Sequence, residues 1–369
     1  MSGTAATIDR ACAACLRRAW LLGALVAHFE RCSPRRSDLS GLLALPDGDL
    51  IRALGGRDVP VLRDRYRGFS PSTLRSTLAA FALHVVCRHD PAYPPQLAEA
   101  PDRPAALFVA GAWERFAALV AAPSVALVGA RRASGYGLEA GRVLGRELAA
   151  AGVTVVSGMA LGVDSAAHAG ALQAPGRTIA VLAASAHVAY PAHGRELHAA
   201  VAARGAVVSE MPPGAEAHRW CFVARNRIIA ALSAATVVVQ ATERSGSLTT
   251  ADFAAEIGRA VGAVPGPVTT RLSAGTHGLI QAGAPLIRDA ADALELLSGA
   301  TGRDYAMAPP PPVALSAPLR RLLDAVENDA LSGLTPTPDQ ARAVLAGLGE
   351  LERLGLVRRG FAGRWERTA

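Results

Sequence analysis

Lysine is absent from this 369-residue sequence, so all 38 of its strongly basic residues are arginines. The absence excludes nucleotide-binding enzymes with a Walker-type phosphate loop, because that loop requires a lysine. The chain is nevertheless basic, with a formal net charge of +7 and a pI of about 9.7. Genomic base composition is one explanation for the bias. Its physical consequence is a preference for anionic partners, since the guanidinium fork pairs with phosphates and stacks on bases.

Cysteine is also scarce. Five cysteines in a chain of this length exclude the disulfide-rich scaffold that is typical of small secreted proteins. Cys12 and Cys15 form a C-x-x-C pair, but we find no second pair of ligands after it. We therefore expect two packed thiols and no metal site. His187, His193 and His198 are close in the sequence, but their spacing does not match a zinc site either.

Long apolar runs are missing too. No uninterrupted apolar stretch approaches the roughly 18 residues that are needed to span a bilayer. The apolar stretch that follows Arg17 and Arg18 lacks the small-residue cleavage site of a signal peptide. We therefore expect a cytoplasmic protein without membrane insertion, and a hydrophobic content of 51% is ample for a sizeable core.

The pattern along the chain predicts four segments. Residues 1–83 have a helical pattern, and residues 84–300 alternate short β-branched runs with amphipathic segments. A proline-rich stretch predicts a semi-rigid linker over 301–318. Residues 319–369 end in a helix, a glycine-led turn and a hairpin. We expect a helical N-terminal domain, an α/β core and a small C-terminal domain.

Six short β-branched runs predict strands of the core. They cover residues 124–129, 153–158, 178–183, 206–210, 236–241 and 261–265. Strands that are apolar throughout and separated by helices are typical of a parallel sheet with both faces covered. The sequence therefore predicts a doubly wound, mostly parallel α/β sheet.

The first of these runs leads into a glycine-rich loop, V-A-L-V-G-A-R-R-A-S-G-Y-G. Its glycines, Gly129, Gly135 and Gly137, do not have the G-x-G-x-x-G spacing of a dinucleotide-binding loop. The next strand ends in Ser157 and Gly158, where a nicotinamide enzyme would place an acidic residue for the ribose. We therefore expect no dinucleotide cofactor.

The strand ends instead carry groups that suit phosphates. Ligands of open parallel sheets bind at the carboxyl ends of the strands, where helix N-termini expose backbone N–H groups. An R-N-R element opens an apolar helix, a phenylalanine precedes it as either a stacking or a buried ring, and S-G-S-L-T-T places hydroxyls at another helix start. The candidate binding residues are Gly129, Arg131, Arg132, Ser157, Gly158, Phe222, Arg225, Asn226, Arg227, Gly246 and Ser247.

Convincing catalytic groups are missing from the pattern. We find no G-x-S-x-G elbow with histidine and acid partners, as a serine hydrolase requires. Asp164 and His168 stand four residues apart, but we expect a helix cap and a packed histidine rather than an acid–base pair. Phosphate-binding strand ends without such a group favour binding over turnover, with no cofactor and no catalytic residue.

At these residues the chain resembles the DNA-processing protein A family (DprA, also called Smf). The resemblance covers roughly residues 84–298 and rests on motifs that occur in order: V-G-A-R-R-A-S-x-Y-G, S-G-M-A-x-G-V-D-x-A-A-H, G-R-T-I-A-V-L, F-V-A-R-N-R-I-I-A-A-L-S, S-G-S-L-T-T-A and A-V-P-G. It implies a helical N-terminal domain resembling SAM or helix-hairpin-helix modules, a Rossmann-like core and a winged-helix-like C-terminal domain.

The same resemblance implies a function. Members of the family bind incoming single-stranded DNA during natural transformation, protect it and load the RecA recombinase onto it. They act as homodimers and are not regarded as enzymes. We therefore expect single-stranded DNA and RecA as partners of this chain, together with a second copy of itself.

Several positions depart from the family pattern. Ala130 stands where a serine is usual, Arg132 replaces a common lysine, Val223 replaces a proline and His277 replaces an asparagine. The C-terminal segment is short of one helix for a helix-turn-helix contact with DNA, and the N-terminal region lacks a clean glycine hairpin motif. We therefore expect the main DNA contacts in the core.

Two other functions fit the same residues. One is an enzyme of the lysine-decarboxylase-like nucleotide N-glycosidase group, whose P-G-G-x-G-T-x-x-E signature is echoed by S-G-S-L-T-T-A-D, with Asp252 in place of the glutamate. The other is a protein that acts chiefly as a recombinase adaptor, whose binding of RecA would not need the arginines.

Overall fold

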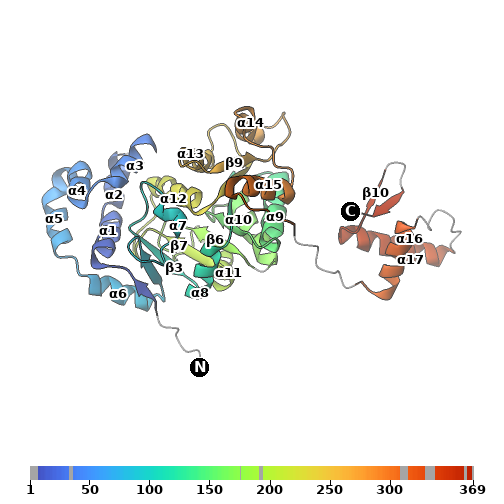
Figure 1. Ribbon diagram of the computed structural model, residues 1–369, viewed down its shortest axis with the longest axis horizontal. Coiled ribbons are helices and arrows are strands. Elements are labelled where there is room, and N and C mark those ends of the chain that lie inside the picture. Colours follow the sequence, from blue (N-terminus) through green and yellow to red (C-terminus); the bar gives the residue numbers. More distant parts are fainter. Residues whose placement is uncertain are drawn as a thin grey trace, which may run out of the picture. The chain divides into compact units, whose positions relative to one another are not determined.

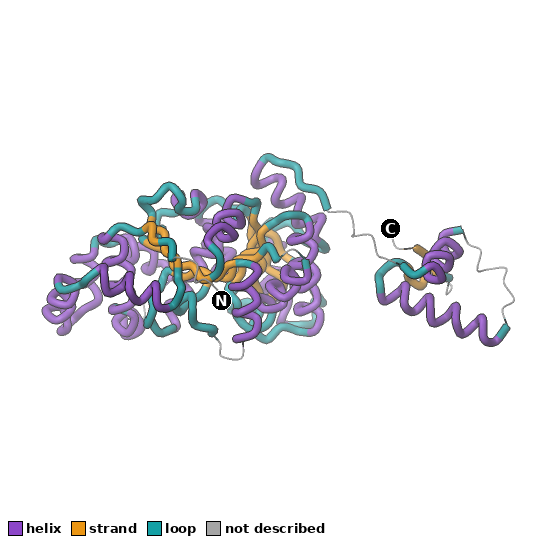
Figure 2. The backbone as a smooth tube through the Cα atoms, turned by 90° about the horizontal axis from the view of Figure 1, so that it is seen from below, coloured by secondary structure: helices purple, strands orange, loops and turns teal. Residues whose placement is uncertain are grey.

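The computed structural model describes residues 7–32, 36–174, 176–190, 194–307, 315–328, 337–360 and 364–367. The chain forms two compact units, Met1–Ala308 and Pro309–Ala369. The larger unit contains a sheet between layers of helices, together with a group of short helices from the N-terminal part of the chain (Figures 1 and 2). Of the helices within the described residues, none has the length and apolarity that crossing a membrane requires.

A single twisted sheet organises the described part of the larger unit. Its nine strands are β1 (Asp9–Arg10), β2 (His84–Cys87), β3 (Ala106–Ala110), β4 (Ser124–Gly129), β5 (Thr154–Ser157), β6 (Thr178–Val181), β7 (Ala206–Ser209), β8 (Ala235–Gln240) and β9 (Ala260–Ala263), in the order β1-β2-β3-β7-β6-β5-β4-β8-β9. β3 is antiparallel to both of its neighbours, β2 and β7, and the other pairs are parallel. The prediction of a mostly parallel, doubly wound sheet is confirmed, and each of the six predicted runs overlaps one strand.

Alternate residues of the central strands face opposite layers of helices. Val125 and Leu127 of β4 pack into one layer, whereas Ala126 and Val128 pack into the other. The first layer contains α9 (Gly135–Ala150), α10 (Val163–Gln173) and α15 (Ala290–Thr301), and the second contains α7 (Pro95–Ala98), α8 (Trp113–Ala121), α12 (Arg219–Leu232) and α13 (Leu248–Glu256). Because both faces of the sheet are buried, the strands are apolar along their whole length.

Further helices cover other parts of the sheet. α11 (Arg195–Arg204) packs with the N-terminal helices over β6 and β7. On the other side, α14 (Ala274–Gln281) contacts β8 and β9, and it is preceded by a short 3₁₀ turn, η3 (Arg271–Ser273). Residues that follow β4, β5 and β8 line a cleft at the carboxyl ends of the strands, which is where a ligand can approach an open sheet.

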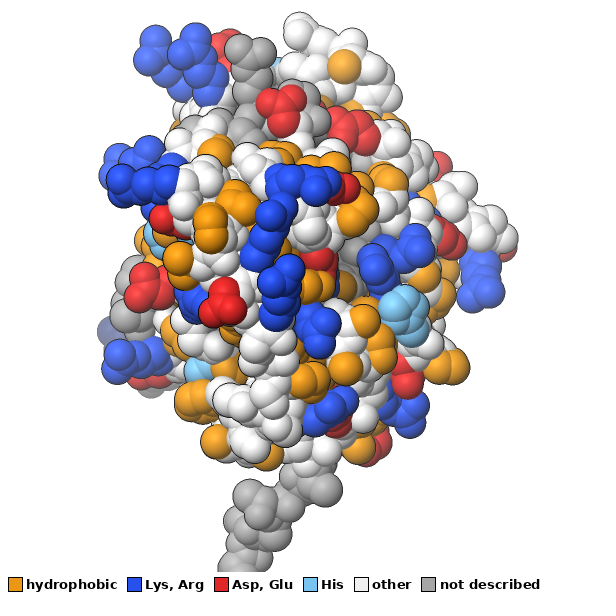
Figure 3. Space-filling model, turned by 90° about the vertical axis from the view of Figure 1, so that its left-hand side faces the viewer, with side chains coloured by type: hydrophobic (Ala, Val, Ile, Leu, Met, Phe, Trp, Pro, Cys, Tyr) orange, Lys and Arg blue, Asp and Glu red, His pale blue; other side chains and the backbone are white. Residues whose placement is uncertain are grey.

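The N-terminal helices pack directly on the sheet domain. They are α1 (Ala13–Ala24), α2 (Val26–Cys32), α3 (Arg36–Ala44), α4 (Asp47–Gly55), the 3₁₀ turn η1 (Gly56–Asp58), α5 (Val59–Arg67) and α6 (Pro71–Ala80). The ring of Phe29 stacks on Trp220 of α12 with 4.1 Å between the centroids, and the Trp220 indole donates a hydrogen bond to the carbonyl of Val26. Arginine side chains are spread over the surface at this end of the unit (Figure 3), and the exposed ones include Arg52, Arg57, Arg63, Arg65 and Arg67.

Strand pairing at the edge of the sheet overturns one sequence-based expectation. β1 pairs in parallel with β2, which brings the residues after β1 next to the residues at the end of β2. Cys87 and His89 therefore lie beside Cys12 and Cys15. The expectation that the C-x-x-C pair has no second pair of ligands is wrong, because the two pairs are about 75 residues apart in the chain and meet only through the sheet.

The smaller unit has its own hydrophobic core. Its described elements are α16 (Ala317–Glu327), α17 (Pro338–Arg353) and an antiparallel hairpin of β10 (Val357–Arg359) and β11 (Trp365–Arg367). Leu323 and Val326 of α16 pack against Leu348 and Leu351 of α17. The predicted helix, turn and hairpin are present, and the described residues of this unit contain two helices. Most of the proline-rich stretch, residues 308–314, lies outside the described residues.

Candidate functional site

A cleft of about 680 Å³ lies at the carboxyl ends of β4 and β8. It is lined by the residues that follow β4, β5 and β8 and by the N-terminal half of α12, and we call it the strand-end cleft. β4 is the strand at which the chain order reverses, since β5, β6 and β7 follow on one side of it and β8 lies on the other. This is the position at which open α/β sheets bind their ligands.

The loop after β4 is held by β8. The amide of Ala130 donates to the carbonyl of Gln240 at 2.7 Å, and the Gln240 side-chain oxygen accepts from the amide of Ser134 at 2.9 Å. Ser134 in turn caps α9 by accepting a hydrogen bond from the amide of Gly137. With its ends fixed in this way, the loop presents the exposed side chains of Arg131 and Arg132 to the cleft.

An arginine and two aromatic rings form the mouth of the cleft. The guanidinium carbon of Arg131 lies 5.0 Å from the centroid of the Phe222 ring, within range of a cation–π interaction. The ring of Tyr190 lies 5.5 Å from the Phe222 ring, and Tyr190 is 48% exposed. Phe222 itself is half-buried, so part of its side chain is exposed. We call these three residues the aromatic platform.

A buried pair of opposite charges lies beneath the platform. Arg225 is almost completely buried, and its guanidinium donates to the carbonyl of Val181 at 3.0 Å. Burial lowers the pKa of Arg225 to about 10, although the nearby carboxylate of Asp164 acts in the opposite direction. Burial likewise raises the pKa of Asp164, against the influence of Arg225 and of the backbone amides around it. The Asp164 carboxylate therefore favours the protonated form of Arg225 at the floor of the cleft.

The polar groups at the carboxyl end of β5 are hydrogen-bonded within the protein. The carboxylate of Asp164 accepts hydrogen bonds from the amides of Gly158 and Ala160, at 3.2 and 3.4 Å. Ser157 is fully buried and donates from its hydroxyl to the carbonyl of Leu127. The amide of Gly158 and the hydroxyl of Ser157, which we expected to face a phosphate, are thus engaged within the protein. Gly158 lines a smaller cavity of about 120 Å³ beside the cleft, which shares Arg225 with it.

Gly158 has a steric role as well. A β-carbon at this position would collide with the guanidinium of Arg225. The absence of a side chain at residue 158 is therefore what allows Arg225 to lie across the end of β5.

Arg227 is not brought to the cleft. Its guanidinium donates to the carboxylate of Glu210 at 2.5 Å and lies 3.7 Å from the carboxylate of Asp102, and all three side chains are less than 10% exposed. Burial opposes its charge, but the two carboxylates outweigh burial and raise the pKa of Arg227. Its place in the structure is a buried ion-pair network that connects α12 to the residues around β3 and β7.

The third strand end, after β8, is tied to α12 through Asn226. The side-chain amide of Asn226 donates to the hydroxyl of Thr249 at 2.7 Å and to the carbonyl of Gly246 at 3.2 Å. The hydroxyls of Ser245 and Ser247 lie 2.7 Å apart, and Ser245 also accepts from the amide of Ser247. The result is a fixed, hydroxyl-rich turn on one wall of the cleft.

The structure brings most of the predicted residues together. Those that line the strand-end cleft are Gly129, Arg131, Arg132, Phe222, Arg225, Asn226, Gly246 and Ser247. Of the positions that depart from the family pattern, Ala130 and Val223 also line the cleft, whereas His277 bonds to the carbonyl of Gly266 outside it. Asp164 is the one carboxylate among the described residues that line the cleft.

Sequence reasoning missed two residues of this cleft. Tyr190 follows β6, and Arg219 is the exposed first residue of α12; both line the cleft. Neither a tyrosine in a loop nor an arginine at the start of a helix carries a motif, so only their positions after a strand and at a helix start could have suggested them.

Three of the histidines considered above are held by hydrogen bonds within the protein. His168 is fully buried and its Nδ1 lies 2.7 Å from the hydroxyl of Thr178, which confirms the expectation of a packed histidine. His187 bonds to the hydroxyl of Ser185, and His198 bonds to the carbonyl of Ala186. His193 lies outside the described residues.

Comparison with known proteins points to one family. The sequence profile of the family described as "DNA recombination-mediator protein A" matches residues 84–298. The X-ray structure of DNA processing protein A (DprA) from Streptococcus pneumoniae is 33% identical, with a TM-score of 0.61 over 76% of this chain and 95% of that chain. A structure of DNA processing protein A from Helicobacter pylori, described by its single-stranded DNA binding mode, is 30% identical with a TM-score of 0.51 over 56% of this chain and 93% of that chain. A relative from Mycobacterium tuberculosis is 46% identical over 179 residues, which are 48% of this chain and only 46% of the relative.

Proposed function

The chain belongs to the DNA recombination-mediator protein A family, and from this premise we propose that it binds single-stranded DNA in the strand-end cleft. The observation that carries the proposal is the aromatic platform, in which Arg131 lies over Phe222 beside the exposed ring of Tyr190. Proteins that bind single strands combine cationic groups along the backbone with aromatic rings on which bases stack. The platform supplies both within one short stretch of surface.

The charges around the platform suit a chain of phosphates. Arg131, Arg132 and Arg219 are exposed at the cleft, while the carboxylate of Asp164 is buried and bound by backbone amides. An exposed cation keeps its full attraction for phosphate at low salt, whereas a buried and compensated carboxylate repels it little. The cleft is therefore positive toward its ligand.

Each group has a distinct role in the proposed complex. Arg131 and Arg132 contact successive phosphates, and Phe222 and Tyr190 stack on unpaired bases. Arg225 is fixed at the floor of the cleft and contributes a positive potential with little loss of side-chain freedom on binding. Binding of this kind tolerates different sequences, because every base has a face that can stack.

The proposal includes the wider role that the family resemblance implies. Bound as a homodimer in the cytoplasm, the chain protects an incoming strand during natural transformation and loads the RecA recombinase onto it. This step needs no catalytic residue and no cofactor in the chain. The loading step is tested by measuring how fast RecA displaces a single-strand binding protein from single-stranded DNA, with and without the chain. We expect faster displacement with the chain, and an unchanged rate would contradict the loading step.

A gel shift with the full-length chain tests the DNA-binding proposal. We expect a single-stranded oligonucleotide to be retarded at concentrations at which the duplex of the same sequence remains free. Equal retardation of the two forms would contradict stacking on unpaired bases, and the absence of any retardation would contradict the proposal as a whole.

The enzymatic alternative has a separate test. A nucleotide N-glycosidase would release free base when the chain is incubated with nucleoside monophosphates, and chromatography of the products would detect it. We expect no release above a control without protein; release of base would contradict a purely binding role for the cleft.

A further inference from the structure

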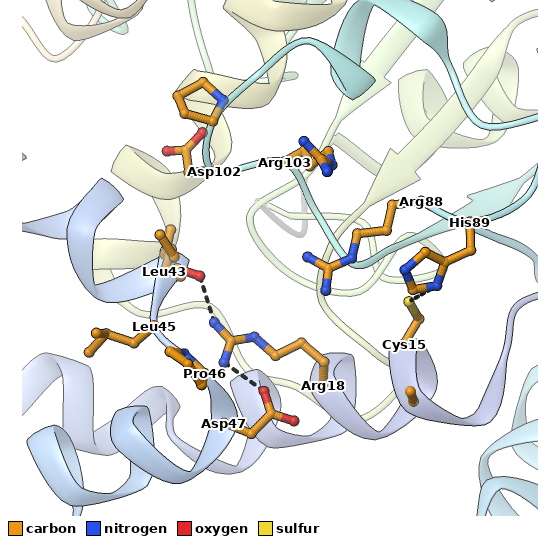
Figure 4. A pocket seen from close by; sticks show the side chains of 13 residues that line it. Cys15, Arg18, Leu43, Leu45, Pro46, Asp47, Arg88, His89, Asp102 and Arg103 are labelled. Carbon is orange, nitrogen blue, oxygen red and sulfur yellow. Dashed lines mark hydrogen bonds and ion pairs between the residues drawn. The ribbon is translucent and has the colours of Figure 1, made fainter.

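Four metal-binding side chains meet at the edge of the sheet, away from the residues that line the strand-end cleft. Cys12 precedes α1, Cys15 lies in its first turn, Cys87 ends β2, and His89 follows two residues later. Their three sulfur atoms and one ring nitrogen all lie within 4.8 Å of one another. The Sγ atoms of Cys12 and Cys15 are each 3.4 Å from Nδ1 of His89. Figure 4 shows Cys15 and His89 pointing toward each other at the rim of a cavity of about 440 Å³.

From this cluster we propose that Cys12, Cys15, Cys87 and His89 bind one zinc ion as a structural Cys₃His site. The inference is independent of the proposed binding of DNA. The site has four protein ligands and no open position, which is the arrangement of structural rather than catalytic zinc.

The spacing of the ligand atoms fits a tetrahedral ion. With Zn–S bonds of about 2.3 Å and Zn–N bonds of about 2.0 Å, tetrahedral angles place sulfur and nitrogen about 3.5 Å apart and two sulfurs about 3.8 Å apart. The two S···N separations of 3.4 Å already have this value. All the remaining separations lie below 4.8 Å, so small rotations of the thiol side chains suffice to close the site around the ion.

The chemistry of the cluster selects zinc over hard cations. Three thiols and an imidazole are ligands for zinc and other soft or borderline metals, whereas magnesium and calcium require oxygen. The backbone supports the thiolate forms, because the amide of Cys12 points at Sγ of Cys87 at 3.4 Å. Cys12 also lies at the N-terminus of a twelve-residue helix, which favours a negatively charged sulfur.

Such an ion would join two parts of the larger unit. Cys12 and Cys15 belong to the N-terminal helices, while Cys87 and His89 belong to the sheet and the turn after β2. β1, the strand that holds this junction, is only two residues long. The zinc would therefore fasten the start of the chain to the edge of the sheet, and its removal should loosen the N-terminal helices.

Metal analysis of the full-length chain, purified without a metal-chelating tag, tests the proposal. We expect about one zinc per chain, as a closed four-ligand site binds zinc tightly. Cys87→Ser and His89→Ala should each lower the zinc content to a small fraction of this value. Cys32→Ser removes an exposed free thiol outside the cluster and is the matched control, which should keep its zinc.

A second measurement on the unmodified chain does not depend on how the variants fold. Replacement of the bound metal by Co²⁺ should give the visible absorption of tetrahedral cobalt together with thiolate-to-cobalt charge transfer. A chain that contains no zinc and binds no Co²⁺, or a His89→Ala variant that keeps a full zinc content, would overturn the proposal. A Cys12–Cys15 disulfide in freshly isolated protein, seen by mass spectrometry, would overturn it in favour of a redox pair.

Discussion

Replacement of Phe222 by alanine is the sharpest perturbation of the proposed DNA contact. The Phe222 ring lies at the centre of the aromatic platform, 5.0 Å from the Arg131 guanidinium carbon and 5.5 Å from the Tyr190 ring. Base stacking on an aromatic ring contributes about 1–3 kcal/mol. The loss of one ring should therefore weaken binding of single-stranded DNA by about 5- to 150-fold, since 1.4 kcal/mol is a factor of ten.

The same substitution should leave most of the stability in place. A fully buried phenylalanine costs about 3–5 kcal/mol when it is truncated to alanine, so a half-buried ring should cost about 1–2 kcal/mol. Urea unfolding first establishes that the variant is folded under the assay conditions. Fluorescence anisotropy with a labelled oligo(dT) then measures the change in affinity alone. Phe69→Ala is the matched control, because Phe69 is also partly buried and packs on another aromatic ring, Trp20, at 5.4 Å. If both variants bind like the wild type, the aromatic platform is not the binding site.

Three further predictions follow from buried groups. Gly158→Ala should displace the guanidinium of Arg225 and weaken single-strand binding about tenfold, by anisotropy, because an added methyl group would overlap it; unaltered binding would exclude Arg225 from the site. Arg227→Met leaves the Glu210 carboxylate buried without its partner, so the free energy of unfolding in urea should fall by about 3–5 kcal/mol, while the affinity of the folded chain stays unchanged. Burial and the charge of Arg225 hold the pKa of His168 at about 3, below its ordinary 6.5. The free energy of unfolding is therefore unaffected by this imidazole above pH 6.5 and falls as the pH is lowered toward 3. Between pH 7 and pH 5 the unfolding free energy should drop by about 2 kcal/mol more in the wild type than in His168→Gln, and parallel pH profiles would show that the imidazole is not the cause.

The strands were predictable because their environment is uniform. β4 is buried along its whole length, so its six residues form one apolar run that ends at Gly129. β5, β6 and β7 show the same pattern on a shorter scale. The strand ends were therefore predictable as well, and with them the positions of Arg131 and Gly246 at one edge of the sheet.

The directions of individual side chains were less predictable from the sequence. Arg225 and Arg227 stand two residues apart in one helix, and at about 100° per residue they must point to nearly opposite sides. The sequence pattern placed both in an apolar helix without showing which side faces the cleft. Only the positions of Glu210 and Asp102, set by the packing of β7 and of the loop before β3, determine that Arg227 turns inward.

Contacts between distant segments left no local pattern. Cys87 and His89 meet the C-x-x-C pair only because β1 and β2 are neighbours in the sheet, and a two-residue strand such as β1 has no recognisable periodicity. Tyr190 reaches the cleft from the loop after β6 for the same kind of reason. Such juxtapositions depend on the order of the strands, which the spacing of apolar residues does not determine.

The salt dependence of single-strand binding tests the central claim most directly. The three exposed arginines of the cleft, Arg131, Arg132 and Arg219, predict a slope of about −2 in a plot of log K against log salt concentration, at roughly −0.7 for each phosphate contact. Arg131→Glu should weaken binding of all sequences alike, by about tenfold or more, and make the slope shallower by about 0.7. Arg146→Glu, with the same change of charge near the far end of α9, should leave both values unchanged. A flat salt response, or equal behaviour of the two variants, would contradict binding of the DNA backbone in the strand-end cleft.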